Sequence, residues 1–216
     1  MTSQNFYMSQ RWRALALTFA VVGALALSGC NAGGEPNQTA SPSPAATESV
    51  VPSPTPAPTA TAAYKPASAS GPAENVPVPM LPEVAKTETK EGLEAFTAYW
   101  YSTLSYAYET GDTRNLATIS GPNCVFCSGL REGITTAWRD GRWVNGGKIE
   151  TPAITAEVNP GLSASAVVQV LQQAMEIRKP DGSLYQDPAA ATNVGSRAGA
   201  TFGETGWLIA DLGLIR

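Results

Sequence analysis

Apolar residues recur at helical spacing across residues 91–112, near the middle of the chain. Successive members of the set are three or four positions apart, which places them on one face of an α-helix: Leu93, Phe96, Trp100, Leu104 and Ala107. Thr87 or Thr89 can cap the start of this helix, and Gly111 stands where helices commonly end in a glycine. The pattern predicts one long helix whose apolar stripe lies in a core.

Two shorter helices are predicted after it. Asp112 is a suitable N-cap for a short helix over residues 113–120. Gly121 and Pro122 then interrupt the helical pattern. A third helix follows and ends near Gly141, and its apolar face carries Leu130, Ile134, Ala137 and Trp138. Three helices therefore precede the first strand.

Beyond Arg142 the period of the pattern changes from helical to alternating. Four stretches bounded by turn residues have the alternation or composition of strands: 149–158, 163–178, 193–203 and 207–215. Asn145, Gly146 and Gly147 are typical of a turn. A run of helices followed by a run of strands indicates an α+β fold, with three N-terminal helices packed on an antiparallel sheet of about four strands.

Composition separates a tether from this folded part. Twelve of the 17 prolines fall between Pro36 and Pro82, among many Ala, Ser and Thr residues and a single aromatic residue, Tyr64. Such a segment cannot bury enough apolar surface to offset its ordering entropy. We predict a disordered tether over residues 30–82 and a single domain over residues 83–216.

The N-terminus has the pattern of an export signal. Arg11 and Arg13 precede an apolar run over residues 14–27, which is short of the roughly 20 residues that a membrane span needs. Leu27-Ser28-Gly29-Cys30 resembles the lipobox of bacterial lipoprotein precursors. The resemblance implies cleavage of residues 1–29 between Gly29 and Cys30, with diacylglycerol on Cys30 anchoring the protein at the extracytoplasmic face of the membrane. An uncleaved anchor helix and an ordinary secretory signal are the alternatives.

Charge and histidine content exclude several classes of function. The net charge is −4, and the chain has no basic run beyond Arg178-Lys179, so the sequence predicts no nucleic-acid partner. It contains no histidine, which excludes Ser-His-Asp catalysis, Cys-His catalysis and histidine metal sites. The remaining carboxylates are scattered, and we assign no catalytic residue, metal site or cofactor among Glu109, Asp112, Asp140, Glu157, Glu176 and Asp211.

Cys124 and Cys127 form a CxxC pair. A zinc site needs four ligands, and two thiols fall short of that number. A thioredoxin-type redox pair normally follows a strand, whereas here a predicted helix and Gly121-Pro122 come first. The oxidising environment outside the cytoplasm favours disulfides in an exported protein. Lipidation of Cys30 would leave two thiols, which can pair with each other. We therefore predict a structural disulfide between Cys124 and Cys127.

The segment EGLEAFTAYWYSTLSYAYETGDTRNLATISGPNCVFC resembles a domain of unknown function found in actinobacterial surface lipoproteins. The resemblance covers about residues 76–216 and implies an architecture similar to the NTF2-like cone, in which a curved sheet and a long helix enclose a pocket. We expect Tyr99, Trp100 and Tyr106 to face such a pocket, with core packing as the alternative. The expected function is a non-enzymatic envelope lipoprotein that binds a small ligand or an envelope protein. The alternatives are an enzyme using Tyr and a carboxylate, and a structural surface protein.

Overall fold

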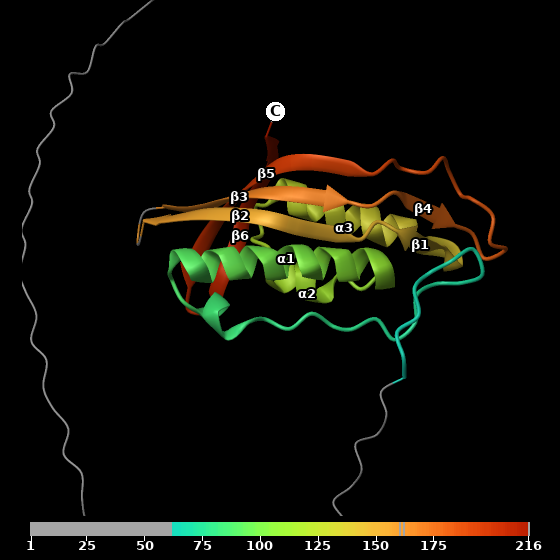
Figure 1. The fold of residues 1–216 in the computed structure, drawn as a ribbon, viewed down its shortest axis with the longest axis horizontal. Helices are drawn as coiled ribbons and strands as arrows, with labels where there is room; N and C mark the ends of the chain where they lie inside the picture. The colour runs from blue at the N-terminus through green and yellow to red at the C-terminus, as the bar shows by residue number, and fades with distance from the viewer. Residues whose placement is uncertain (1–61, 160, 162, 216) are drawn as a thin grey trace, which may run out of the picture. The chain divides into compact units, whose positions relative to one another are not determined.

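The computed structural model describes residues 62–159, 161 and 163–215 (Figure 1). The predicted signal peptide, Cys30 and the predicted tether as far as residue 61 lie outside the described residues. The described chain runs through three α-helices and then six strands, with a short 3₁₀ turn before the first helix, Glu83–Lys86, and another after the third, Arg139–Gly141.

The long helix is present as predicted. α1 spans Lys90–Thr110, and Thr89 Oγ1 accepts a hydrogen bond from the Gly92 N–H at 3.0 Å. Gly111 ends the helix in the left-handed conformation at φ 75°. The five side chains of the predicted stripe are at most 3% exposed. Burial of each large apolar side chain contributes about 1.5–3 kcal/mol, so this stripe is a main source of the core's stability.

The two following helices differ in detail from the prediction. α2 spans Arg114–Thr118, so its N-cap position is Thr113 and not Asp112. The Asp112 carboxylate still accepts a hydrogen bond from the Arg114 N–H at 3.0 Å. α3 spans Val125–Ala137 and begins inside the CxxC pair, with Cys124 as its N-cap.

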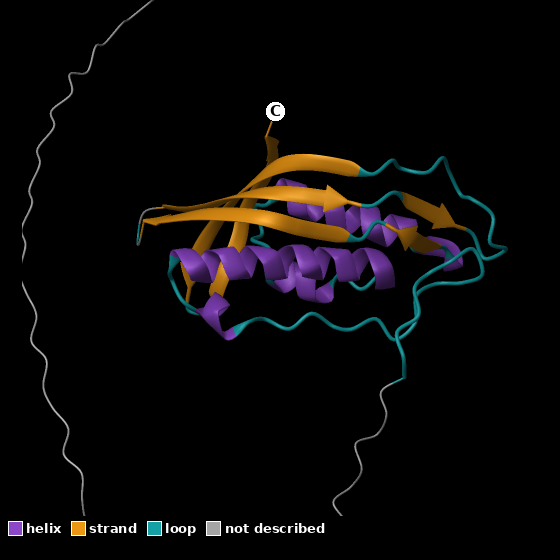
Figure 2. Cartoon of the chain, in the orientation of Figure 1, coloured by secondary structure: helices purple, strands orange, loops and turns teal. Residues whose placement is uncertain are grey.

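The six strands pair with one another antiparallel (Figure 2), and one isolated parallel bridge joins Ser120 to Ile209 of β6. Four strands form the larger sheet in the order β2-β3-β5-β6, and they span Ile149–Asn159, Ser163–Gln172, Thr192–Gly203 and Gly206–Ile215. Two short strands form a second sheet, and they span Trp143–Gly146 (β1) and Met175–Arg178 (β4).

The predicted fold class is therefore wrong. The prediction was an NTF2-like cone with one sheet of about four strands under three N-terminal helices, whereas the structure has six strands in two sheets and more residues in strands than in helices. The helices occupy residues 90–137, the middle of the chain, and do not form one layer over one sheet. α1 contacts β1 of the smaller sheet as well as β2, β3 and β6 of the larger sheet, and α3 contacts β6 (Figure 1).

The single strand predicted over residues 163–178 is two strands, because the chain beside it bends at two glycines. Gly146 and Gly147 have φ values of 82° and 75°, a region that favours glycine. A Cβ at Gly146 would lie 2.3 Å from the Ala174 carbonyl oxygen. The Gly147 N–H donates to that same oxygen at 3.0 Å, so the β1-β4 pair leaves the larger sheet at this point.

Residues 62–82, which we call the strap, contact the domain, although the sequence places them in the tether. Lys65 and Glu74 pair as a small antiparallel bridge. The Trp143 indole N–H donates to the Ser68 carbonyl at 2.9 Å, and the Tyr64 hydroxyl donates to the Glu109 carboxylate. Because of these contacts, the folded part of the chain begins before Glu83.

Candidate ligand-binding cavity

An apolar cavity lies between the helices and the inner face of the larger sheet. Its volume is about 230 Å³, and we call it the inner cavity. α1 and α3 contribute Tyr101, Leu104, Tyr108, Phe126 and Leu130. The strands contribute five apolar side chains, Ile149, Val170, Val194, Leu212 and Leu214, and three polar ones, Gln172, Thr192 and Ser196. The set contains no charged side chain, so the described lining is uncharged.

Two tyrosines from α1 bring hydroxyl groups to this apolar lining. Tyr101 and Tyr108 are seven residues apart, two helical turns, and therefore project from the same flank of α1. Burial raises the pKa of the Tyr101 phenol, and a hydrogen bond with Ser196 offsets part of the increase. Burial likewise raises the pKa of Tyr108, with a partly offsetting hydrogen bond to Gln172. Both phenols are neutral at physiological pH, and Ser196 and Gln172 of the sheet line the cavity with them.

A second hollow, the outer groove, adjoins the inner cavity along the same face of α3. Its volume is about 360 Å³. α3 lines it with Phe126, Gly129, Leu130, Gly133, Ile134 and Ala137. The opposite wall is formed by Tyr108 of α1 and by the β1-β4 pair, which contributes Val144, Met175 and Ile177. The outer groove is again apolar, and it shares Tyr108, Phe126 and Leu130 with the inner cavity.

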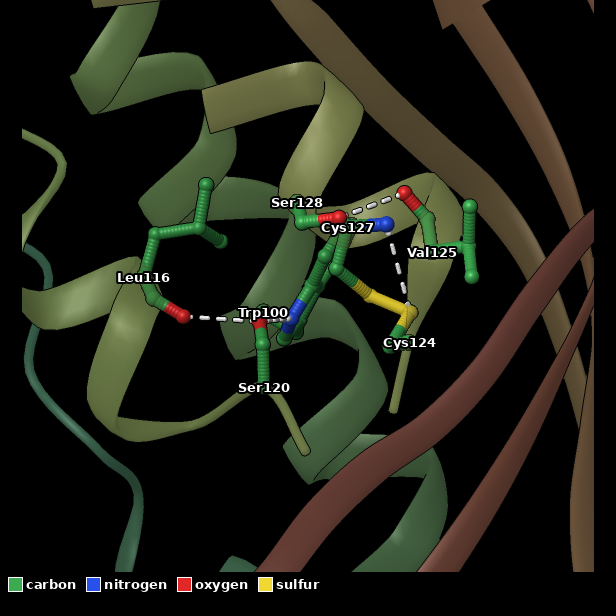
Figure 3. Close-up of a disulfide and its surroundings, with 7 residues drawn as sticks. All are labelled: Trp100, Leu116, Ser120, Cys124, Val125, Cys127 and Ser128. Carbon is green, nitrogen blue, oxygen red and sulfur yellow. Dashed lines mark hydrogen bonds between the residues drawn. A yellow bond between two sulfur atoms is a disulfide. The ribbon is translucent and has the colours of Figure 1, made fainter. Parts of the chain in front are cut away.

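The CxxC pair fixes the start of α3 beside both hollows. Cys124 and Cys127 form a disulfide, and the Cys127 N–H donates to Cys124 Sγ at 3.2 Å (Figure 3). Both cysteines are 1% exposed, whereas the two residues between them, Val125 and Phe126, are 81% and 40% exposed. The disulfide ring thus holds the backbone of Phe126 at the point where the inner cavity and the outer groove meet.

The predicted pocket residues lie elsewhere. Trp100 is fully buried, and its indole N–H donates to Ser120 Oγ at 2.9 Å (Figure 3). Tyr99 and Tyr106 are partly buried and line neither the inner cavity nor the outer groove. The cavity uses the opposite flank of α1, with Tyr101 and Tyr108. The spacing of these two tyrosines was visible in the sequence, but nothing in the sequence showed which flank faces a cavity.

None of the scattered carboxylates lines the inner cavity, and four of them, Glu109, Asp112, Asp140 and Glu176, make local pairs. Arg114 holds the pKa of Asp112 at about 2 through a side-chain and a backbone hydrogen bond. Hydrogen bonds from Asn145 and Arg178 lower the pKa of Glu176. Across the part of the chain that the structure describes, no group of three or more Cys, Asp or Glu side chains gathers to hold a metal ion. No described helix has the length and hydropathy that crossing a membrane requires.

The fold and the site define a mixed helix-and-sheet domain with an uncharged apolar cavity beside α3. By sequence, the chain belongs to the Family of unknown function (DUF6318), which matches residues 62–212. The match confirms the predicted resemblance to a domain of unknown function and includes the strap. The lipoprotein character of the N-terminus remains a prediction.

Two solved structures are similar to the domain. One is the intermembrane space region of the chloroplast protein ARC6, with a TM-score of 0.42 and 10% identity over 59% of this chain and 96% of that chain. The other is a domain of unknown function with a cystatin-like fold from Nostoc punctiforme, with a TM-score of 0.38 and 14% identity over 59% of this chain and 79% of that chain. No curated protein matches the chain.

Proposed function

We propose that this protein is an envelope lipoprotein whose domain binds a small, uncharged, mainly apolar ligand in the inner cavity. The observation that carries the proposal is the lining of that cavity, which combines apolar side chains with the hydroxyls of Tyr101 and Tyr108. Binding sites for small molecules typically have this composition, with a few polar groups in an apolar wall.

The chemistry of the lining selects for an uncharged ligand. Moving an ion out of water is costly unless the protein supplies a partner of opposite charge, and the described lining supplies none. The neutral phenols and the Gln172 amide can each donate a hydrogen bond to, or accept one from, a ligand hydroxyl, carbonyl or amide.

The alternative of an enzyme that uses a tyrosine with a carboxylate is less well supported by this site. A general acid or base needs a pKa near the working pH. Burial moves the pKa values of Tyr101 and Tyr108 upward, away from neutrality. The described residues around the cavity include no Asp or Glu that could accept a proton from either phenol.

The test compares two probes that share an aromatic system and differ in charge. N-phenyl-1-naphthylamine is neutral, and 8-anilino-1-naphthalenesulfonate is its anionic counterpart. We expect the neutral probe to bind with enhanced fluorescence and the anionic probe to bind about tenfold more weakly or worse, a difference of about 1.4 kcal/mol. Equal binding of the two probes, or no binding of the neutral one, would contradict the proposal.

A pair of substitutions on neighbouring strands locates the binding. Val194→Phe adds volume inside the cavity, whereas Val167→Phe makes the same change at a position that is 50% exposed and does not line it. Val194→Phe should weaken binding of the neutral probe by about tenfold or more. Val167→Phe should bind the probe about as tightly as the unsubstituted protein does. Circular dichroism of both variants checks that they are folded.

The location is the second half of the proposal. We infer that diacylglycerol on Cys30 anchors the mature chain outside the membrane, since two acyl chains, at about 0.8 kcal/mol per buried CH₂, hold a protein firmly. The Leu27-Ser28-Gly29-Cys30 sequence supports this, as does the disulfide that already accounts for Cys124 and Cys127. Cys30→Ala should abolish incorporation of an alkyne-labelled fatty acid, and unchanged labelling would refute lipidation at Cys30.

A further inference from the structure

The inner cavity and the outer groove meet at three side chains. Both hollows are lined by Tyr108, Phe126 and Leu130. Phe126 and Leu130 are four residues apart on α3, so they lie one above the other on the same face of the helix. The two hollows are therefore neighbouring compartments that share this pair of side chains as part of their walls.

We propose that the two compartments form one elongated binding site for a single uncharged alkyl or acyl chain, and that Phe126 is the residue that sets how long a chain the site accepts. The proposal rests on the proposed function of the inner cavity and names its ligand class. The polar end of the ligand lies with the Tyr101 and Tyr108 hydroxyls, and its chain passes Phe126 into the outer groove.

The composition of the outer groove fits an alkyl chain. Its described lining has no charged side chain, and its one side-chain hydroxyl, on Tyr108, is shared with the inner cavity. A chain of methylene groups needs no hydrogen bonds, and it gains free energy from each group that leaves water.

Two glycines keep the outer groove open. Gly129 and Gly133 line it from consecutive turns of α3, and a Cβ built on either would meet no atom within 4 Å. Glycine inside a helix costs about 0.5–1 kcal/mol relative to alanine, so α3 is less stable than it would be with side chains there. The structure gives no packing reason for these glycines, whereas an occupant of the groove would use the space.

Phe126 is suited to act as a gate. The disulfide ring and the Cys127–Cys124 contact hold its backbone, while its side chain remains 40% exposed. An aromatic side chain with that freedom can change rotamer without moving α3. Rotation of the ring would join or separate the two compartments.

Chain length is the measurement that tests the proposal. Straight-chain primary alcohols from hexanol to tetradecanol are used to displace N-phenyl-1-naphthylamine from the full chain. Each methylene that enters an apolar site strengthens binding by about fourfold. We expect this gain to continue beyond the length at which the inner cavity alone is filled, and we expect Phe126→Ala to bind the longest alcohols more tightly than the unsubstituted protein.

Filling the outer groove gives the decisive variant. Gly133→Leu should leave the affinity for short alcohols unchanged, and affinity should stop rising at a shorter chain length than in the unsubstituted protein. Thr135→Leu, on the exposed side of α3, should change neither the affinity for short alcohols nor the length at which affinity stops rising. If affinity levels off at short chains and Gly133→Leu has no effect, the elongated site is refuted while the inner cavity stands. If the neutral probe does not bind at all, the proposed function itself fails.

Discussion

Trp100 is a core residue whose polar indole N–H is paired by one hydrogen bond. The residue is fully buried, and its indole N–H donates to Ser120 Oγ, which in turn donates to the Leu116 carbonyl at 2.7 Å. Ser120→Ala leaves the indole N–H without its partner in the core, which costs about 1–3 kcal/mol. Urea unfolding should show this loss. Ser128→Ala, which removes an exposed hydroxyl bonded to the Val125 carbonyl, should cost within about 0.5 kcal/mol.

Tyr64 gives a prediction in pH. Burial, together with the hydrogen bond to Glu109 and its negative charge, raises the pKa of Tyr64 from 10.0 to about 12. The folded state therefore holds this proton more tightly than the unfolded state, so its contribution to stability is complete below pH 10.0 and is lost as the pH rises towards 12. The tyrosinate absorbance of the protein minus that of Tyr64→Phe should titrate near pH 12.

Glu109→Gln is the matched control for that titration. It keeps a hydrogen-bond acceptor and removes the negative charge, so the midpoint assigned to Tyr64 should move down towards 10.0. A midpoint near 10.0 in the unsubstituted protein would show that the Tyr64–Glu109 contact does not form in solution.

The tyrosines also mark the limit of residue-level prediction. Tyr99 and Tyr106 lie on one flank of α1 and Tyr101 and Tyr108 on the other, and both flanks border the same buried stripe. Which flank faces a cavity depends on where α3 and the sheet pack, and these are contacts between segments distant in sequence. The sequence therefore pointed to α1 but could not show which of its flanks lines the cavity.

At the scale of elements, the sequence predicted α1 from local patterns but did not predict how the strands pair. The caps and stripe of α1 depend on residues within a few turns of one another, and the structure confirms them. The division of residues 163–178 depends on Gly146 and Gly147, which are neighbours of that strand in space only. Because a turn signal and a bend between two paired strands use the same residues, the sequence did not reveal β1 or its pairing with β4.

Two glycine-to-alanine substitutions should have opposite effects on stability. Gly111 ends α1 at φ 75°, and a Cβ there would lie 2.7 Å from the Trp138 ring, so Gly111→Ala should destabilise the protein by more than about 1 kcal/mol. Gly129 lies inside α3 with open space around it, so Gly129→Ala should stabilise the fold by about 0.5–1 kcal/mol. Thermal unfolding of both variants measures the signs, and equal signs would contradict this account of the two positions.

At the scale of the whole molecule, the strap determines where the domain begins. Composition alone assigned residues 62–82 to the tether, because proline-rich sequence lacks the apolar content of a core. The strap is instead held against the domain by individual hydrogen bonds and by close packing of its backbone on a neighbouring loop. The Ala69 carbonyl oxygen lies where a Cβ on Gly182 would come within 2.5 Å, so the strap runs directly against the loop after β4. Composition cannot reveal such contacts.

Truncation tests this boundary. A chain that begins at Glu83 loses the Ser68 carbonyl, and the indole N–H of Trp143, a side chain only 5% exposed, is left without its acceptor. The loss should cost about 1–3 kcal/mol, and it should appear as a lower urea midpoint than that of a chain that begins at residue 62. Trp143→Phe removes the same donor, so truncation should cost less in the Trp143→Phe background than in the unsubstituted one. Equal midpoints for the two lengths of unsubstituted chain would return the boundary to Glu83 and make the strap part of the tether.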